Sequence, residues 1–441
     1  MTEPYRPPLL IVADSPEALT DLCGISLLER MRRIALHLGF REAMILSNSV
    51  KSVAAHVANE SWRRADVSLR FRERTGAKVT VGDILDCLAA LGVAGDGQIL
   101  VVFAGFYCDE RLLRSLADAQ TNSVLIDSDP PSFVAPLLKN SDNDSSWLLC
   151  AALLSSEWLS RKNRADLLEG EINSDTMTGL ITRVDAALQQ AYVGSMRRSV
   201  RPVFFPAPSL ERRPLAERLL RDATQKGVLD FPALVHAPIE KWLVAHLCRT
   251  TITPNQITFG TAVLGLGVTL LYAGGNLWAG VLLALAIGVL DGIDGKLARL
   301  KAQTTKLGKK EHDLDYLIET SWWMALAYHF HATGQVRYAY IIFFAFFAFH
   351  RLERMAKKAV QRRIGRNLDD FAPFDRLVRI VAGRRNIYTW LFAFFLVIGA
   401  PATGFISLCL WGVASAVIHI LRALQIGFAG QDKVASTSTP S

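Results

Sequence analysis

The residues most suited to chemistry lie in the segment LDGIDGKLAR, at the end of a long apolar run. Asp291 and Asp294 are three residues apart, so on a helix they project from the same face. Two carboxylates held together at the end of an apolar helix repel each other unless a cation neutralises them. Oxygen ligands at this spacing suit a hard divalent ion, Mg²⁺ or Mn²⁺. We therefore expect both residues to bind metal.

The residues that follow the two aspartates suit a phosphate ligand. Gly295 and Ala298 are small, which lets a ligand approach the helix backbone closely. Arg299 carries a planar guanidinium whose donors match phosphate oxygens. The segment as a whole therefore predicts a site for a phosphate-bearing molecule.

A second acidic series begins the next apolar run. Glu311, Asp315 and Glu319 recur every four residues and therefore share one helix face. Two acidic faces that meet in a helix bundle would clamp two metal ions for phosphoryl transfer. On charge spacing alone, acids paired with the neighbouring lysines explain the pattern equally well.

Length and composition divide the chain into two unlike halves. It has 441 residues and a net charge of +8, with 51% hydrophobic and 20% charged residues. Up to about residue 235 the chain is mixed and charged, and after about residue 257 long apolar runs alternate with basic clusters. The abundant apolar residues exclude disorder for most of the chain, and six scattered cysteines without a CxxC pair exclude a disulfide scaffold. We expect buried thiols in a reducing compartment.

Six apolar runs in the second half approach the length needed to cross a bilayer, about 20 residues. They are about residues 257–274, 277–292, 314–331, 336–354, 387–400 and 405–428. Lys and Arg cluster in two of the connecting loops, which places those loops and both termini in the cytoplasm. We expect an all-α, six-helix, multi-pass domain over residues 257–428 in the inner (cytoplasmic) membrane, followed by a disordered tail over residues 429–441.

Residues 201–256 are expected to link the two halves. Within them, residues 230–249 form an amphipathic stretch with Trp242 beside an apolar face, which suits a helix lying in the membrane interface. The alternative is an ordinary linker helix packed on the soluble half. The chain starts without a basic segment followed by an apolar core, so we expect no signal peptide and a cytoplasmic N-terminal half.

The acidic segment resembles the signature of the CDP-alcohol phosphotransferases (CDP-alcohol phosphatidyltransferases), D-x2-D-G-x2-A-R-x8-G-x3-D-x3-D. The matching residues are Asp291, Asp294, Gly295, Ala298, Arg299 and Gly308, and TPNQIT at 253–258 resembles what precedes the first span in this family. The resemblance covers about residues 230–428 and implies a six-helix membrane fold with two divalent ions, Mg²⁺ or Mn²⁺. It also implies a CDP-alcohol donor bound by the matching residues, a hydroxyl acceptor and release of CMP. We further expect a homodimer through the membrane domain and no nucleic-acid partner.

The end of the signature departs from the family, because His312 and Tyr316 stand where the family has aspartates. A three-residue insertion, which we prefer, brings Asp315 and Glu319 into register. A one-residue deletion brings in Glu311 and Asp315 instead. In the preferred register, the resemblance implies that Asp315 and Glu319 are metal ligands and that Glu319 takes the acceptor's proton. In the rival register, these roles pass to Glu311 and Asp315.

Basic residues close the fourth apolar run. Arg351 and Arg354 lie on one helix face and would hold a phosphate on the acceptor. Family members that take phosphorylated inositol acceptors have a basic pocket of this kind. Anchoring of a helix end to lipid headgroups explains these residues equally well, and the same two readings apply to GRRN at 383–386.

The first half alternates strand-like runs with amphipathic helices over residues 9–128, which predicts an α/β domain with a mostly parallel sheet. Its segments resemble those of the sugar-nucleotide nucleotidyltransferases, and we expect the domain to cover residues 1–200. Parts that this family uses for catalysis are missing. The loop after the first strand has no Gly, Lys or Arg before Gly24, and Gly105-Phe106 stands in place of a metal-binding Gly-Asp. We expect this domain to be inactive and to serve interaction or regulation.

Domains of this kind are fused to CDP-alcohol phosphotransferases in bifunctional inositol-phosphate cytidylyltransferases, which the chain resembles. We expect a membrane enzyme that moves a substituted phosphate from CDP-diacylglycerol or a CDP-inositol-type donor to a hydroxyl, with an inositol phosphate as candidate acceptor. Its product would be a phospholipid or a phosphoinositol. The alternative is a catalytically decayed scaffold or regulatory protein. A transporter is disfavoured, because the acids cluster at one membrane face rather than at mid-span.

Overall fold

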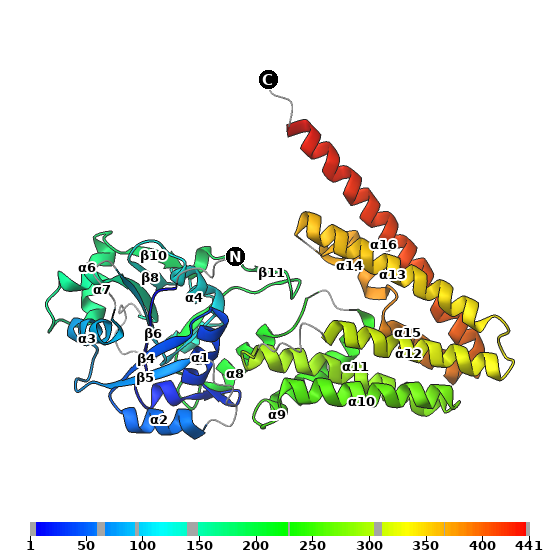
Figure 1. Cartoon of the computed structure of the whole chain (residues 1–441), viewed down its shortest axis with the longest axis horizontal. Helices are drawn as coiled ribbons and strands as arrows, with labels where there is room; N and C mark the ends of the chain where they lie inside the picture. Colours follow the sequence, from blue (N-terminus) through cyan, green and yellow to red (C-terminus); the bar gives the residue numbers. More distant parts are fainter. Residues whose placement is uncertain are drawn as a thin grey trace.

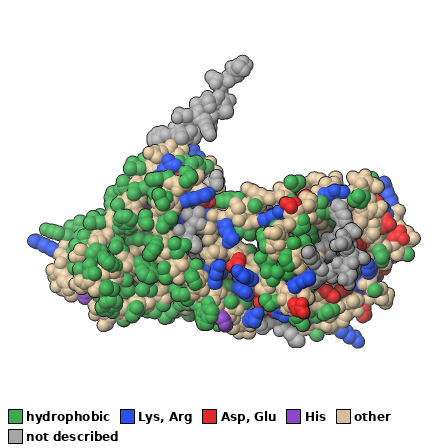
Figure 2. All heavy atoms as spheres, turned by 180° about the vertical axis from the view of Figure 1, so that it is seen from behind, with side chains coloured by type: hydrophobic (Ala, Val, Ile, Leu, Met, Phe, Trp, Pro, Cys, Tyr) green, Lys and Arg blue, Asp and Glu red, His purple; other side chains and the backbone are tan. Residues whose placement is uncertain are grey.

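The computed structural model describes residues 6–59, 67–92, 97–138, 149–227, 230–303, 311–365 and 367–437. The chain folds into an α/β part and a helical part that lie end to end, with α8 (Arg213–Ala223) and α9 (Phe231–Leu247) at their junction (Figure 1). The division predicted from composition is also visible on the surface. Figure 2 shows apolar side chains over much of the helical part, whereas the charged side chains gather mainly on the α/β part.

A seven-stranded sheet organises the α/β part, in the order β10-β8-β9-β6-β1-β4-β5. The strands are β1 (Leu9–Val12), β4 (Glu42–Ser47), β5 (Ser68–Glu73), β6 (Gln98–Phe103), β8 (Ser123–Ile126), β9 (Ala151–Ser155) and β10 (Thr182–Asp185). The central β1 pairs in parallel with β4 and β6, and β9 runs antiparallel to β6 and β8. The predicted α/β class with a mostly parallel sheet is therefore confirmed.

Burial on both faces of the sheet explains why its central strands are almost wholly apolar. The helices are α1 (Leu27–His37), α2 (Val50–Asn59), α3 (Val81–Leu91), α4 (Glu110–Ala117), α5 (Ala135–Leu138), α6 (Ser156–Ser160) and α7 (Leu168–Met177). Leu9 and Ile11 pack into one core with α1 and α4, and Leu10 and Val12 pack into a second core with α3 and α7. Alternate residues of one strand thus serve opposite faces.

Three short antiparallel pairs complete the α/β part and reach toward the helical part. They are β2 (Asp21–Leu22) with β3 (Ile25–Ser26), β7 (Phe106–Cys108) with β13 (Phe204–Pro206), and β11 (Tyr192–Val193) with β12 (Arg198–Ser199). The β11–β12 hairpin also contacts the helical part, where the Tyr192 hydroxyl donates a hydrogen bond to the Asp370 carboxylate. Contacts between the two parts therefore form at more than one place.

The helical part places one helix at each of the six predicted apolar runs. Its long helices are α10 (Pro254–Ala273), α11 (Leu277–Leu300), α12 (Glu311–Ala332), α13 (Ala339–Ile364), α15 (Arg385–Val397) and α16 (Pro401–Thr437), with the short α14 (Pro373–Val381) before α15. Their common core is aromatic and includes Trp322, Phe330, Phe392 and Phe405.

The expectation of six spans is met only in part. Among the described residues, three helices are long and apolar enough to cross a membrane: α10, α11 and the segment 401–426 of α16. The helix α15 is apolar but has only 13 residues. Acidic residues begin α12, and basic residues end α13, so their charge lowers the mean hydropathy although both helices pack in the same bundle.

The predicted amphipathic stretch at 230–249 is the helix α9. It exposes an apolar face and buries polar side chains. Most of its exposed side chains are apolar and include Leu234, Ile239 and Trp242, whereas its buried ones include His236 and Glu240. An apolar face turned outward suits a lipid interface more than an aqueous surface. Its buried face packs against α11, where the Glu240 carboxylate is partnered by a lysine at 2.5 Å.

Candidate active site

The helix α11 carries the two aspartates of the motif near its C-terminal end, and two neighbouring helices hold them. Asp294 is buried, and its Oδ2 accepts a hydrogen bond of 2.8 Å from the Thr258 hydroxyl on α10. Asp291 is more exposed, and its Oδ2 lies 2.7 Å from a guanidinium nitrogen of Arg385 at the start of α15. The two carboxylates are thus fixed in position by different partners.

The acids of α12 join the same site. The charges of Asp291, Asp294 and Glu319 all act on the Asp315 carboxyl. Arg385 interacts electrostatically with Asp291, Glu319 and Asp315 as well. The four carboxylates of the preferred register therefore gather between the ends of α11 and α12, and Asp291, Asp315 and Glu319 share the guanidinium of Arg385.

The remaining predicted residues fall into two groups. Gly308 lies outside the described residues, and so does the side chain of Glu311, although its backbone begins α12. Arg351 and Arg354 do come together, because their guanidinium carbons lie 5.7 and 4.1 Å from the ring centre of Tyr316. Tyr316, the residue that departs from the family pattern, therefore faces the basic end of α13.

The donor set at this site fits hard divalent ions by its chemistry, since it consists of carboxylate oxygens on two packed helices. Among the described residues, however, no three Asp, Glu, His or Cys side chains converge at the distances of a metal site. Positive charges face the carboxylates from Arg385, whose side chain is 15% exposed, and from Arg299 and Lys226. The two metal ions therefore remain an expectation from the donor set.

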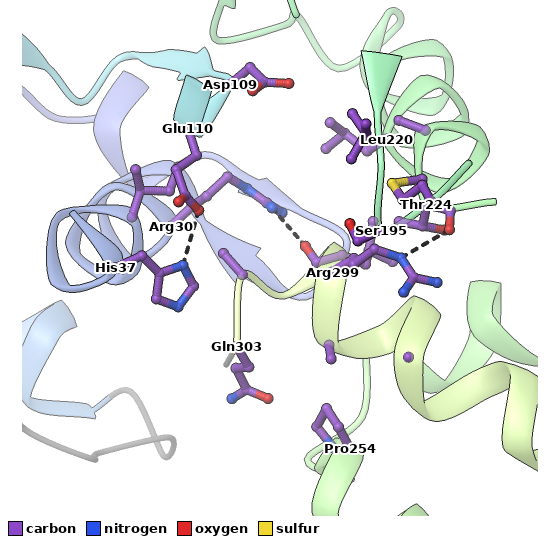
Figure 3. A pocket seen from close by; sticks show the side chains of 18 of the residues that line it. Arg30, His37, Asp109, Glu110, Ser195, Leu220, Thr224, Pro254, Arg299 and Gln303 are labelled. Carbon is purple, nitrogen blue, oxygen red and sulfur yellow. Dashed lines mark hydrogen bonds and ion pairs between the residues drawn. The ribbon is translucent and has the colours of Figure 1, made fainter. Parts of the chain in front are cut away.

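A cavity of about 660 Å³ adjoins the motif, between the helical and the α/β parts (Figure 3). Asp294, Gly295, Ala298 and Arg299 line it from α11. Arg299 is held at this wall, because its Nε donates to the Thr224 carbonyl oxygen at 3.1 Å. Three predicted donor-binding residues, Gly295, Ala298 and Arg299, and the predicted metal ligand Asp294 thus face a single cavity. Its volume suits a small ligand, for which roughly 300–1,000 Å³ is typical.

Sequence reasoning did not anticipate the opposite wall of this cavity, which belongs to the α/β part. Arg30, His37, Tyr107, Asp109 and Glu110 line it, and Figure 3 shows His37 and Glu110 across from Arg299. These residues are far from the motif in the chain, so no spacing could have linked them. The partners Thr258 and Arg385 did lie in noted segments, TPNQIT and GRRN, but without an assigned role.

The α/β part has a second, smaller cavity of about 230 Å³, at the ends of β1 and β6. Asp14 and Arg74 line it and form an ion pair, and the Arg74 side chain is only 1% exposed. Asp109 does not line this second cavity. It caps the N-terminus of α4 and pairs with Arg111. The two cavities share no lining residue.

Comparison with known proteins relates the helical part to one family. Residues 251–417 match the CDP-alcohol phosphatidyltransferase family. A curated relative, the bifunctional IPC transferase and DIPP synthase of Thermococcus kodakarensis, is 40% identical over 86 residues, which make up 19% of this chain and 20% of that protein. The match thus spans about a fifth of the relative's length.

Two solved structures resemble separate parts of the chain. The phosphatidylinositol phosphate synthase of Mycobacterium tuberculosis with CDP-DAG bound is 18% identical, with a TM-score of 0.33, over 43% of this chain and 94% of that one. The inositol-1-phosphate CTP transferase of T. maritima is 9% identical, with a TM-score of 0.33, over 49% of this chain and 98% of that one. These values are low, so the family assignment depends on residues 251–417.

Proposed function

Residues 251–417 form a domain of the CDP-alcohol phosphatidyltransferase family, a family of transferases, and on that premise we propose that this protein is an integral membrane phosphotransferase. It moves a substituted phosphate from a CDP-alcohol donor to an acceptor hydroxyl and releases CMP. The gathering of four carboxylates at the ends of α11 and α12, next to a cavity lined by the motif, carries this proposal.

The donor's phosphates are assigned to the α11 wall of the cavity. Gly295 and Ala298 leave the helix backbone accessible there, and Arg299 adds a positive charge. Two Mg²⁺ or Mn²⁺ ions held by the carboxylates would neutralise the diphosphate and stabilise the charge that develops on it. Asp291, Asp294, Asp315 and Glu319 are the proposed ligands, with Glu311 as the alternative.

Glu319 is the proposed base in the transfer step. Its carboxylate accepts the proton of the acceptor hydroxyl, and the freed oxygen attacks the donor phosphorus that bears the alcohol. A new P–O bond forms as the bond between this phosphorus and the CMP oxygen breaks. The leaving CMP carries away the negative charge, which Arg299 helps to stabilise.

The acceptor site is proposed at Arg351 and Arg354. Both guanidinium groups lie over the Tyr316 ring, one residue beyond Asp315, so a phosphate held by them would lie near the carboxylates. This charge supports a phosphorylated acceptor, of which an inositol phosphate is the candidate. The donor is then CDP-diacylglycerol or a CDP-inositol-type molecule, and the pathway is that of phospholipids or phosphoinositols.

We also propose that all six long helices of residues 257–428 cross the inner membrane, with both termini in the cytoplasm and α9 in the interface. Three sufficiently apolar helices and the outward apolar face of α9 support this arrangement. A homodimer through the membrane domain would cover part of the apolar surface seen in Figure 2.

The α/β domain is proposed to have lost nucleotidyltransferase activity. A nucleoside triphosphate would be expected at the ends of β1 and β6. A small cavity lies there, and the Asp14–Arg74 ion pair forms part of its lining. Asp109, the nearest aspartate to the expected metal position, is engaged as a helix cap.

The test is release of CMP by the purified full-length protein in detergent. CDP-diacylglycerol is supplied with an inositol phosphate, with Mn²⁺ or Mg²⁺ or with EDTA. We expect CMP release with either metal, and none with EDTA or from the Asp294→Asn variant. A folded protein that releases no CMP from any CDP-alcohol would instead support the alternative, a decayed scaffold.

A further inference from the structure

The cavity beside the motif has two walls of different origin, and their separation is fixed. Arg30 on α1 donates to the Leu300 carbonyl oxygen at 2.6 Å, and Arg33 donates to the Lys301 carbonyl oxygen at 2.8 Å. The C-terminal end of α11 is thus held by two guanidinium groups of the α/β domain, where they complement the partial negative charge of a helix end.

Apolar packing joins the same two walls. One hydrophobic cluster combines Ile293 and Leu297 of α11 with Leu22 and Leu27 of the α/β domain, and also includes Val244 of α9. These side chains are almost completely buried. The α/β wall is therefore a permanent part of the cavity and keeps its distance from the motif.

A hydrogen-bonded pair of side chains lies on the α/β wall. His37 on α1 and Glu110 in the first turn of α4 lie 3.1 Å apart, from Nδ1 to Oε2, and both line the cavity. Arg114 donates to the other carboxylate oxygen of Glu110 at 2.6 Å. Burial raises the pKa of Glu110, but the hydrogen bonds from His37 and Arg114 lower it further, so the net shift is downward and the group is a carboxylate near neutral pH.

The position of this pair matches one part of the proposed donor. With the phosphates at Asp294 and Arg299, the alcohol of a lipid donor must run toward the apolar helices. The nucleoside is the part that remains to face the α/β wall. A carboxylate has about four acceptor positions, so Glu110 keeps some of them after binding its two partners.

We propose that the α/β domain reads the base of the donor nucleotide and that Glu110 is the residue that selects cytosine. Cytosine presents an N4 amino group, which donates to a carboxylate, whereas the matching position of uracil and thymine is a carbonyl oxygen, which a carboxylate repels. His37 holds the Glu110 carboxylate in place. This inference rests on the proposed function, and it gives the α/β domain a role in binding although its own nucleotide site is closed.

Binding of CMP and UMP to the purified full-length protein tests the inference, by titration calorimetry with Mg²⁺ or Mn²⁺ present. We expect the wild-type protein to bind CMP at least about tenfold more tightly than UMP, as one base-specific contact allows. Glu110→Gln should bring the two affinities close together, because an amide can also donate to the uracil oxygen. The matched control is Glu157→Gln, which removes an exposed carboxylate of the same domain that pairs with Arg161; its CMP-to-UMP ratio should equal that of the wild type.

Each other outcome has a defined meaning. If Glu110→Gln binds CMP and UMP with the wild-type ratio, or if the wild type does not distinguish them, the inference is wrong and the proposed function stands. If the wild type binds neither nucleotide, the proposed function itself is refuted. Should Glu110→Gln fail to fold, as judged by its melting temperature, His37→Gln is measured instead, and an unchanged ratio there also overturns the inference.

Discussion

Arg385 and Asp291 form an ion pair of 2.7 Å that joins the start of α15 to the motif on α11. The guanidinium carbon of Arg385 also lies 6.0 Å from the ring centre of Trp322, so α12 helps to hold it. The pair gives the acid cluster a built-in positive charge. It explains how several carboxylates can share one end of a helix bundle without unfolding it, since a counter-charge relieves their repulsion.

The first prediction concerns the motif aspartates. Asp291→Asn and Asp294→Asn keep the side-chain shape but remove a charge that the metal ions need, so kcat should fall at least about a hundredfold. Expression and melting temperature should change little. Rates of CMP release with saturating Mn²⁺ measure the effect, and near-normal turnover in either variant would exclude that residue from the mechanism.

The second prediction settles the register of α12. Asp315→Asn should inactivate the enzyme in both alignments. Glu319→Gln should abolish transfer, whereas Glu311→Gln should cost little, because in the preferred register Glu319 binds metal and Glu311 does not. The same CMP assay distinguishes the two, and an inactive Glu311→Gln beside an active Glu319→Gln would establish the rival alignment.

The third prediction concerns the hydroxyl that holds Asp294. Thr258→Val keeps the shape of the side chain but removes the hydrogen bond to a buried carboxylate, so kcat/KM should fall about tenfold. Thr258→Ser retains the hydroxyl and should stay within about twofold of the wild type. Equal losses in the two variants would show that packing, rather than the hydrogen bond, is what matters at this position.

The fourth prediction concerns stability and pH, at a site away from the spans. Burial raises the pKa of Asp369, but Arg384 and Lys357 lower it more, to about 2. Because this value lies below the unfolded one of about 4, Asp369 stabilises the fold above that pH, and the contribution is lost as the pH falls toward 2. Asp369→Asn should therefore lower the free energy of unfolding at pH 7 by about 3 kcal/mol, because it leaves buried cations unpaired. The melting temperature should fall with it.

The comparison with the wild type over a range of pH checks the sign of this effect. The difference in melting temperature between the wild type and Asp369→Asn should shrink below about pH 4. A difference that is constant down to acid pH would mean that the carboxylate charge contributes nothing. The exposed pair partner Glu157→Gln again serves as a control, with a difference near zero throughout.

The last prediction concerns the α/β domain. The full-length protein should release no pyrophosphate from CTP and a phosphorylated alcohol. The reason is that Arg74 and Asp14, which line the small cavity, form an ion pair with each other and are not available to bind CTP. Pyrophosphate formation that depends on the phospho-alcohol would contradict the proposed loss of activity. Asp109 would then be the first residue to substitute.

Local spacing explains which parts could be predicted. The distance between Asp291 and Asp294, and the four-residue rhythm of Asp315 and Glu319, determine helix faces, and the structure brings these faces together. Alternating apolar runs likewise predicted the parallel sheet. The sequence could not predict that Glu110 would lie across a cavity from the motif, because that placement depends on packing between residues nearly two hundred positions apart.

The number of spans shows a different limit. Hydropathy treats each helix as if lipid surrounded it, but α12 and α13 turn part of their surface toward the bundle and a polar site. Tyr316 and Arg354 can therefore meet at the end of an otherwise apolar helix pair. Composition indicates where helices form, and it does not say which of them reach through the bilayer.

The hydrophobic cluster that joins Leu22 and Leu27 to Ile293 and Leu297 makes the two parts a single cooperative unit at their junction. Unfolding the α/β domain would strip the motif helix of its cover and expose apolar side chains to water. Heat or denaturant should therefore melt both parts in one transition. The α/β domain therefore protects the motif helix through its fold, independently of any chemistry of its own.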